Sequence, residues 1–283
     1  MIDLDAYLRR IAYRGPTSPT LEALRAICAA HPAAIAFENI DPLLGRAPLL
    51  APEALQAKLV DHRRGGYCYE QNALLRLALL ELGMSVTSLA ARVVWMGPPG
   101  AAPRARSHML LAVELPADGD ERGPWLVDAG FGGHLIRTPL CLVPGLVQPT
   151  PTGIERIVQN RDVMTFETEL PTGWAPLYRF TLEPLLPVDY EPLNWFTATH
   201  PSSIFRHNLR MERLTAERRA GLLNDRLTLR PVDGPAELRH IESAEALAAV
   251  LEEVFDIEAP VSAEELFARI PKGLEGAYLP ASG

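Results

Sequence analysis

The residue types best suited to covalent chemistry lie in the segment RGGYCYEQN at positions 64–72. Its two glycines let the backbone turn tightly and approach a ligand closely. Leucines at helical spacing follow, and Gly83 is a typical helix end, so the pattern predicts an amphipathic helix that begins near Cys68. Unpaired N–H groups and the helix dipole at such a start favour the thiolate form of Cys68. Cys68 is therefore a candidate nucleophile, although a core cysteine beside a helix start fits this short motif as well.

A nucleophile of this kind needs a base, and the base needs an acceptor that orients it. His108 stands at the head of the strand-like run HMLLAV, and Asp128 lies within a second such run, WLVDAGF. An aspartate in an apolar strand is costly to bury unless another group pairs with it. If the two strands are neighbours, Asp128 holds the His108 ring and stabilises its protonated form. The order Cys, His, Asp suits a thiol acyl-transfer triad.

The elements that must position these residues change in type along the chain. The first 84 residues show helical periodicity, and Ser18 followed by Pro19 predicts the start of a second helix. From residue 85 to 190, short runs rich in Val, Leu and aromatic residues alternate with Gly and Pro clusters, which predicts an antiparallel sheet or a small barrel. Residues 191–283 combine further strand patterns with two closing helices.

Taken together, the motifs resemble the arylamine N-acetyltransferase family over nearly the whole chain. The family's Arg-Gly-Gly-aromatic-Cys-aromatic-Glu-x-Asn box corresponds to residues 64–72, its histidine strand to 107–111 and its Trp-Leu-Val-Asp-x-Gly-Phe-Gly strand to 125–132. An early Phe-Glu-Asn motif corresponds to 37–39, and a late Asn-x-x-x-x-x-His-Pro-x-Ser-x-Phe stretch to 194–205. Each piece alone is moderately specific, whereas all of them in the right order make the resemblance strong.

The resemblance implies an α+β fold with a catalytic core like that of cysteine proteases and transglutaminases. The implied domains are an N-terminal helical bundle that carries the nucleophile (1–84), a central antiparallel β-barrel that carries the histidine and the aspartate (85–190), and a C-terminal α/β lid with its linking helix (191–283). It also implies that Cys68, His108 and Asp128 form the catalytic triad. Glu38 and Arg64 correspond to an internal ion pair that braces the loop before Cys68.

The same resemblance implies a substrate pocket rich in aromatic residues, with the substrate-binding set Phe37, Tyr69, Met109, Gly130, Phe131 and Phe205. The implied activity is ping-pong acetyl transfer from acetyl-CoA, a co-substrate, through an acetyl-cysteine to aromatic amines, hydrazines or arylhydroxylamines. We expect no metal, because the histidines show no metal-like spacing with the cysteines, and no tightly bound cofactor. The oligomeric state stays open.

Charge and composition exclude several classes of protein and partner. The 27 basic and 35 acidic residues give a net charge of −8 with no basic stripe, so neither nucleic acid nor an anionic membrane is an expected partner. The start MIDLDAYLRR lacks the apolar core of a signal peptide, and no apolar run approaches the roughly 18 residues of a spanning helix. Three cysteines argue against a disulfide framework. We therefore expect a cytoplasmic location.

Three other functions stay open on the sequence alone. A cysteine hydrolase would use the same triad with water as the acceptor, and peptide cleavage without coenzyme A would identify it. An amide synthase of the same fold would join or close a polyketide-type chain and would be indifferent to acetyl-CoA. A non-catalytic protein that binds coenzyme A or an aromatic ligand would leave the active-site cysteine unlabelled by reagents.

Overall fold

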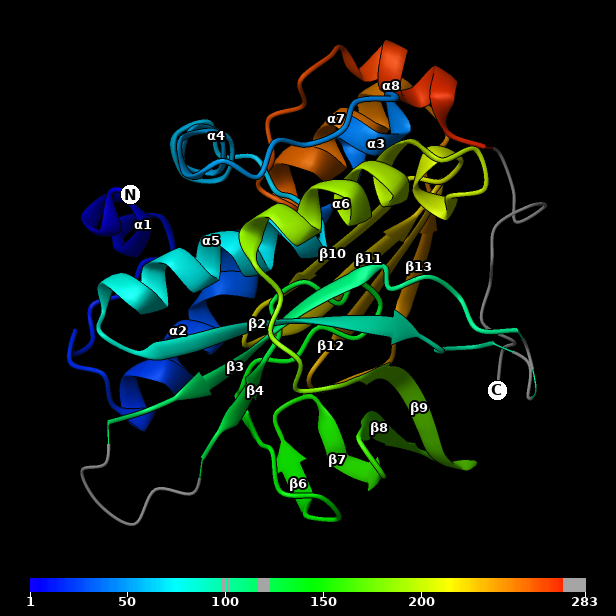
Figure 1. The fold of residues 1–283 in the computed structure, drawn as a ribbon. Coiled ribbons are helices and arrows are strands. Elements are labelled where there is room, and N and C mark those ends of the chain that lie inside the picture. Colours follow the sequence, from blue (N-terminus) through cyan, green and yellow to red (C-terminus); the bar gives the residue numbers. More distant parts are fainter. Residues whose placement is uncertain (98–99, 101, 117–122, 272–283) are drawn as a thin grey trace.

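The structure, a computed structural model, describes residues 1–97, 100, 102–116 and 123–271 of the chain. Helices of the N-terminal part, an eight-stranded sheet and a five-stranded sheet follow one another along the sequence. In Figure 1 the last two helices (orange to red) lie at the top, the strands of residues 147–180 (green) lie at the bottom, and the five-stranded sheet lies between them. The α+β class predicted from the sequence is confirmed.

The N-terminal part is helical, as its periodicity predicts. Its elements are α1 (Leu4–Arg10), α2 (Leu21–Ala34), α3 (Ile40–Leu43), α4 (Pro52–Leu55), the π-helix η1 (Gln56–Asp61) and α5 (Cys68–Glu81). The predicted start of α2 at Ser18 is wrong. Thr20 is extended and its hydroxyl accepts a hydrogen bond from the N–H of Ala23 at 3.2 Å, so Thr20 caps a helix that begins at Leu21.

The larger sheet is antiparallel throughout and curls around its own apolar core. Its strands are β2 (Ser85–Val93), β3 (His108–Glu114), β4 (Trp125–Val127), β5 (Leu140–Cys141), β6 (Val147–Thr150), β7 (Gly153–Asn160), β8 (Val163–Leu170) and β9 (Gly173–Phe180), in the order β5-β4-β3-β2-β9-β8-β7-β6. Leu110 of β3 belongs to the same buried cluster as Ile157 of β7 and Phe166 of β8, although β3 neighbours neither β7 nor β8. The sheet is therefore barrel-like, as expected.

The position of Asp128 relative to its strand differs from the prediction. Asp128 was expected inside a strand, but β4 ends at Val127, and Asp128 is the first residue after it. The adjacent strand β3 begins at His108, and Leu111 of β3 pairs with Val127 of β4. The triad candidates therefore stand at one end of two paired strands, where the chain leaves the regular ladder and side chains have room to approach each other.

The five-stranded sheet joins the two ends of the chain. Its order is β1 (Phe37–Glu38), β10 (Arg210–Leu214), β11 (Arg218–Leu223), β12 (Arg226–Pro231) and β13 (Glu237–His240). Helices α7 (Ala244–Glu253) and α8 (Ala263–Arg269) bury their apolar faces against it. The short strand β1, which periodicity could not reveal, comes from the N-terminal part. It places Phe37 and Glu38 beside the C-terminal strands.

Helix α6 (Tyr190–Thr199) connects the two sheets, flanked by the 3-10 turns η2 (Pro187–Asp189) and η3 (Ile204–Arg206). It runs close to α5 in Figure 1, and α5 in turn lies against β2 and β3. The division into domains at residues 84 and 190 stays a prediction. In the part of the chain that the structure describes, no helix combines the length and apolar character needed to cross a membrane.

Candidate active site

Cys68 is the first residue of α5 and follows a loop that is clamped against β1. The N–H of Glu38 donates to the carbonyl of Gly66 at 3.0 Å, and the N–H of Gly66 donates to the carbonyl of Ala36. A Cβ on Gly65 would lie only 2.2 Å from the Ala36 carbonyl oxygen. Gly65 is thus required by the close approach of the chain at β1, whereas a Cβ on Gly66 would lie 2.8 Å from Cβ of Glu70 in the first turn of α5. The result is a fixed entry of the chain into the helix that begins with the nucleophile.

Beneath this loop lies a cluster of five charges. Arg64 donates to one carboxylate oxygen of Glu38 through Nη2 at 2.6 Å and through Nε at 3.1 Å. Lys58 lies 2.6 Å from a carboxylate oxygen of Asp41 and 2.6 Å from one of Glu70. Three carboxylates and two cations therefore share one largely buried site. The Glu38–Arg64 pair implied by the resemblance lies within it.

The cluster holds both cations in their charged state. Burial alone would lower the pKa of Lys58, but the surrounding carboxylates raise this pKa above its ordinary value. The same balance raises the pKa of Arg64, chiefly through Glu38. Glu70 also accepts a hydrogen bond from the backbone N–H of Tyr67 at 3.2 Å, which satisfies a donor at the start of α5. The cluster therefore anchors both the loop and the first turn of the helix.

His108 and Asp128 form the second part of the site. Nε2 of His108 lies 2.6 Å from Oδ2 of Asp128, and both side chains are almost fully buried. Burial alone would lower the pKa of His108, but the charge of Asp128 and hydrogen bonds to Asp128 and Cys68 raise it to about 10. Since Nε2 faces Asp128, Nδ1 is the ring nitrogen left for the Cys68 thiol. The three residues predicted as a triad are brought together.

The side-chain amide of Asn72 orients Asp128. The sequence analysis assigned no role to Asn72. Nδ2 of Asn72 donates to Oδ1 of Asp128 at 3.0 Å and to the carbonyl of Met109 at 2.7 Å. The N–H of Gly130 donates to the same Oδ1 at 2.9 Å. Burial alone would raise the pKa of Asp128, but His108 together with these donors lowers it. Asp128 is thus held ionised and in one orientation, with its other oxygen directed to His108.

Gly130 is placed where no side chain could stand. A Cβ built on it would lie 2.5 Å from Cα of Cys68 and 2.9 Å from Nδ2 of Asn72. The chain after Asp128 therefore passes directly over the start of α5. This contact gives a physical reason for glycine at a position that the resemblance assigned to substrate binding.

Aromatic rings enclose the imidazole on the barrel side. The ring of Phe131 lies edge-on to His108 with centroids 5.1 Å apart, and the ring of Tyr178 lies 5.0 Å from His108. Both rings are buried. The sequence analysis did not predict that Tyr178 of β9 would lie at the site. Its place in an ordinary apolar strand does not distinguish it from a core residue. Burial, followed by the negative charge of Asp128, raises its pKa.

The other predicted pocket residues divide into two groups. Phe37 lies against Gly132, where a Cβ would come within 2.5 Å of its ring, and it contacts Phe205 at a centroid distance of 6.3 Å. These residues therefore lie on the same side of the site as Phe131. Tyr69 packs against Tyr67 at 5.4 Å and against Tyr190 of α6 at 6.0 Å, and its hydroxyl lies 3.4 Å from that of Thr197 on α6.

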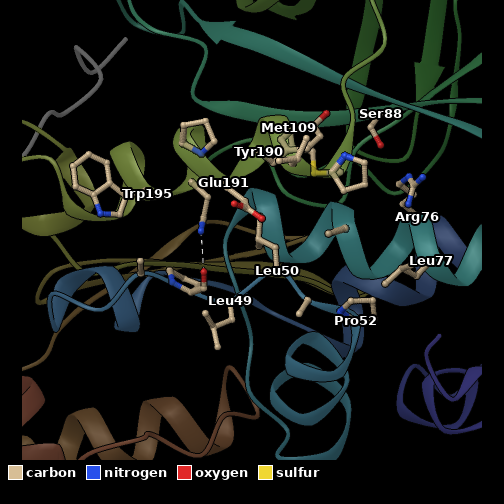
Figure 2. Close-up of a pocket in the computed structure, with 18 residues that line it drawn as sticks. Leu49, Leu50, Pro52, Arg76, Leu77, Ser88, Met109, Tyr190, Glu191 and Trp195 are labelled. Atoms are coloured by element: carbon tan, nitrogen blue, oxygen red, sulfur yellow. Dashed lines mark hydrogen bonds between the residues drawn. The ribbon is translucent and has the colours of Figure 1, made fainter.

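Met109 also belongs to the second group. It lines a separate cavity next to α6, which Figure 2 shows. Because successive strand residues point to opposite faces, Met109 and His108 face opposite sides of β3. The structure thus brings Phe37, Gly130, Phe131 and Phe205 to the triad side, while Tyr69 and Met109 face α6.

Another buried network supports the loop from behind. Nε2 of Gln71 donates to the carbonyls of Ala36 at 2.7 Å and Gly66 at 3.1 Å, and its Oε1 lies 2.7 Å from Nε2 of His31. The hydroxyl of Tyr7 is 2.9 Å from the other ring nitrogen of His31. Desolvation lowers the pKa of His31 to about 4, so this histidine is a neutral hydrogen-bonding bridge. Gln71, which occupies the variable position x of the Glu-x-Asn motif, therefore has a structural role in this chain.

Among the residues that the structure describes, no group of three or more His, Cys, Asp or Glu side chains is arranged to hold a metal ion. The arrangement of the triad residues suits covalent acyl transfer. A thiol at a helix start faces an imidazole that a buried carboxylate orients, and the first-turn N–H groups of α5 have no acceptor within the helix.

Comparison with known proteins agrees with this geometry. A profile of the N-acetyltransferase family matches residues 20–263. An arylamine N-acetyltransferase of Mycolicibacterium smegmatis is 42% identical over 253 residues, which cover 88% of this chain and 90% of the relative. The chain belongs to the arylamine N-acetyltransferase family. An arylamine N-acetyltransferase of Escherichia coli is 38% identical over 90% of this chain and 88% of its own.

Solved structures of arylamine N-acetyltransferases match over the same extent. The M. smegmatis enzyme superposes with a TM-score of 0.90 at 38% identity and covers 96% of this chain and 100% of its own. The Mycobacterium marinum enzyme in complex with CoA gives a TM-score of 0.88 at 39% identity, with 95% and 99% covered. The fold of this arylamine N-acetyltransferase family member, and its class as an acyltransferase, therefore stand on both sequence and structure.

Proposed function

We propose that this chain transfers the acetyl group of acetyl-CoA to an aromatic amine, hydrazine or arylhydroxylamine through an acetyl-Cys68 intermediate. The observation that carries the proposal is the buried His108–Asp128 pair, 2.6 Å apart, with Cys68 as the next hydrogen-bonding partner of the imidazole. The names of the related enzymes, and the solved relative in complex with CoA, support the choice of donor and acceptor.

In the first half-reaction, Cys68 is the nucleophile. Because the pKa of His108 is raised to about 10, the imidazole is protonated near neutral pH and stabilises the thiolate beside it. The thiolate attacks the thioester carbonyl of acetyl-CoA, and the backbone N–H of Cys68 is placed to donate to the developing oxyanion. The new S–C bond forms as the bond to coenzyme A breaks. His108 gives its proton to the departing thiolate.

In the second half-reaction, the neutral His108 acts as the base. The acceptor nitrogen attacks the acetyl-Cys68 carbonyl, and His108 takes the proton that this nitrogen loses. Asp128 stabilises the imidazolium that re-forms, while Cys68 leaves as the thiolate. The cycle closes with the ion pair restored, one thioester consumed and one amide formed.

The preference for an aromatic acceptor follows from basicity and from the surrounding rings. An aromatic amine is largely unprotonated near pH 7, so its lone pair is available, whereas an alkyl amine must first lose a proton. Phe37, Phe131 and Phe205 lie on the triad side of the site and offer apolar faces to a flat ring.

The nucleophile candidate Cys68 and the buried Cys28 are free thiols. A reactive free thiol persists most readily in a reducing compartment, which supports a cytoplasmic location for the reaction.

Initial-rate kinetics with acetyl-CoA and p-anisidine test the proposal. Varying both substrates should give parallel double-reciprocal lines, because the acetyl-enzyme forms before the amine reacts. Cys68→Ala should abolish turnover, whereas the matched variant Cys28→Ala, which removes a buried thiol of α2, should keep it. Intersecting lines, or turnover by Cys68→Ala, would overturn the covalent route.

A further inference from the structure

A cavity lies between α5, α6 and the segment 47–52, with a volume of about 1060 Å³ (Figure 2). Its size is that of a site for a small organic molecule, for which about 300–1,000 Å³ is usual. None of Cys68, His108 and Asp128 lines it. It is therefore distinct from the triad, and the proposed acetyl transfer gives it no role.

The two faces of α5 explain this separation. Cys68, Asn72 and Leu75 follow one another at a spacing of four and three residues and face β3 and the triad. Arg76 and Leu77 follow Ala73 by three and four residues on a different face, and all three line the cavity. One helix thus presents the nucleophile on one side and the cavity wall on the other.

Most of the cavity wall is apolar, and part of it is open to solvent. Leucine, proline, valine, methionine and tryptophan side chains form it: Leu49, Leu50, Pro52, Leu77, Met109, Pro187, Val188, Pro192 and Trp195. At the mouth, Leu49 is 72% exposed and Trp195 is 61% exposed. Large apolar side chains gathered at an open cavity mark a binding surface, because water leaves them at a gain in free energy when a ligand covers them.

Arg76 is the one cation of the cavity wall. Its Nε is buried and has no hydrogen-bond partner, and no described residue forms an ion pair with it. Figure 2 shows Arg76 and Ser88 at one end of the cavity and Trp195 at the other. The other charged lining residue, Glu191, is exposed and does not pair with Arg76. An arginine that is left partly buried without an acid is costly unless an anion joins it.

The hydroxyl groups near Arg76 extend the polar end. Ser88 of β2 is buried and lines the cavity, and Tyr190 of α6 lies next to it with its hydroxyl donating to the carbonyl of Leu89 at 2.9 Å. The Ser88 side chain in turn hydrogen-bonds to the Tyr190 hydroxyl, so Arg76 is the donor left for a ligand. The cavity therefore combines a hydrogen-bond donor, the Arg76 guanidinium, at one end with a long apolar wall.

We propose that this cavity binds an amphipathic monocarboxylate, with its carboxylate accepting from Arg76 and its apolar body lying along Leu50, Leu77 and Val188. Charge complementarity selects the headgroup, and the apolar wall selects an alkyl or aryl body over a sugar or a nucleotide. Ala73 and Met109, which border the cavity, are the chain neighbours of Asn72 and His108. The bound ligand would thus contact the segments that carry the triad from their outer side.

Isothermal titration with decanoate tests this site, with decanol as the uncharged ligand of the same length. Wild-type protein should bind decanoate, and Arg76→Met should bind it about tenfold or more weakly, the loss expected for one charge-assisted hydrogen-bonding partner. Decanol should bind both proteins equally. Arg230→Met, which removes an exposed arginine on β12, is the matched control and should bind decanoate as the wild type does. Saturating coenzyme A should leave decanoate binding unchanged.

Several results would overturn the proposal. Absence of decanoate binding to the wild type, or equal binding by Arg76→Met with its fold intact by circular dichroism, would remove the role of Arg76. Displacement of decanoate by coenzyme A would place the ligand in the acetyl-transfer site instead. A concentration-dependent dimer that excludes decanoate would assign the cavity to a second copy of this chain.

Discussion

Nδ2 of Asn72 lies 3.0 Å from Oδ1 of Asp128, and Oδ2 of the same carboxylate lies 2.6 Å from Nε2 of His108. The helix that begins with the nucleophile therefore also supplies, one turn later, the amide that orients the aspartate. Cys68 and Asp128 come from different parts of the chain, and Asn72 links their positions directly. The amide is a positioning group: it acts on the reaction through Asp128 and His108.

Replacing Asn72 by Ala should lower kcat for an aromatic amine by about 10–100-fold, the loss typical when a residue that orients a catalytic ligand is removed. The pH at which the rate changes should also move, because the imidazole loses a well-ordered carboxylate. The pH–rate profile distinguishes this role from a general loss of folding. The matched variant Asn160→Ala, at the exposed end of β7, should leave both rate and profile unchanged. An Asn72→Ala enzyme with a normal profile would assign the amide no positioning role.

Asp128→Asn should change how stability depends on pH. The folded-state pKa of His108, about 10, lies above its ordinary value of 6.5, so the folded protein keeps a proton that the unfolded chain releases. This stabilisation is fully present below pH 6.5 and is lost as the pH rises toward 10. The difference in unfolding free energy between wild type and Asp128→Asn should therefore shrink between pH 6.5 and pH 9.5 in urea titrations. A constant difference would mean that His108 is not held protonated.

Gly130→Ala should damage the reaction through the nucleophile itself. A new Cβ would lie 2.5 Å from Cα of Cys68, so the start of α5 or the loop after Asp128 must shift. Acetylation of Cys68 by acetyl-CoA should slow at least about tenfold, since misplacement by about 1 Å costs up to about 10²-fold in rate. Gly221→Ala on β11, where a Cβ meets nothing within 4 Å, is the control and should react normally. Equal rates for both variants would show that this close contact is unimportant.

Arg64→Met should destabilise the fold. The variant leaves three carboxylates around Lys58. Removing one partner of a buried ion pair lowers the free energy of unfolding by about 3–5 kcal/mol. Arg239→Met removes a pair with Glu237 in which both side chains are more than half exposed, and it should leave the free energy of unfolding nearly unchanged. Urea denaturation of the two variants measures both values. Similar small losses would mean that the cluster is not a source of stability.

The sequence was most informative where chemistry restricts residue type. The thiol at a helix start, the histidine at a strand start and the glycine pair follow rules that operate over a few residues, and the structure brings them together. The resemblance supplied the Glu38–Arg64 pair, but its partners Lys58 and Asp41 were not foreseen. They come from η1 and α3, and no local pattern indicates which charges will share a buried site.

Other parts depend on tertiary contacts that periodicity does not report. Strand β1 has two residues and forms only because the C-terminal strands offer it a partner. The resemblance assigned Met109 and Tyr69, the chain neighbours of His108 and Cys68, to the substrate pocket. In the structure their side chains face α6, because alternation along β3 and rotation along α5 separate neighbours in sequence onto different faces.

The central claim is that Cys68 carries the acetyl group between donor and acceptor. The most direct test is the intact mass of the protein after mixing with acetyl-CoA alone, with Cys68→Ala treated in parallel. The wild type should gain one acetyl group and lose it when an aromatic amine is added, while the variant should gain none. A wild type that acetylates the amine without ever carrying the acetyl group, or a Cys68→Ala protein that becomes acetylated to the same extent, would contradict the account.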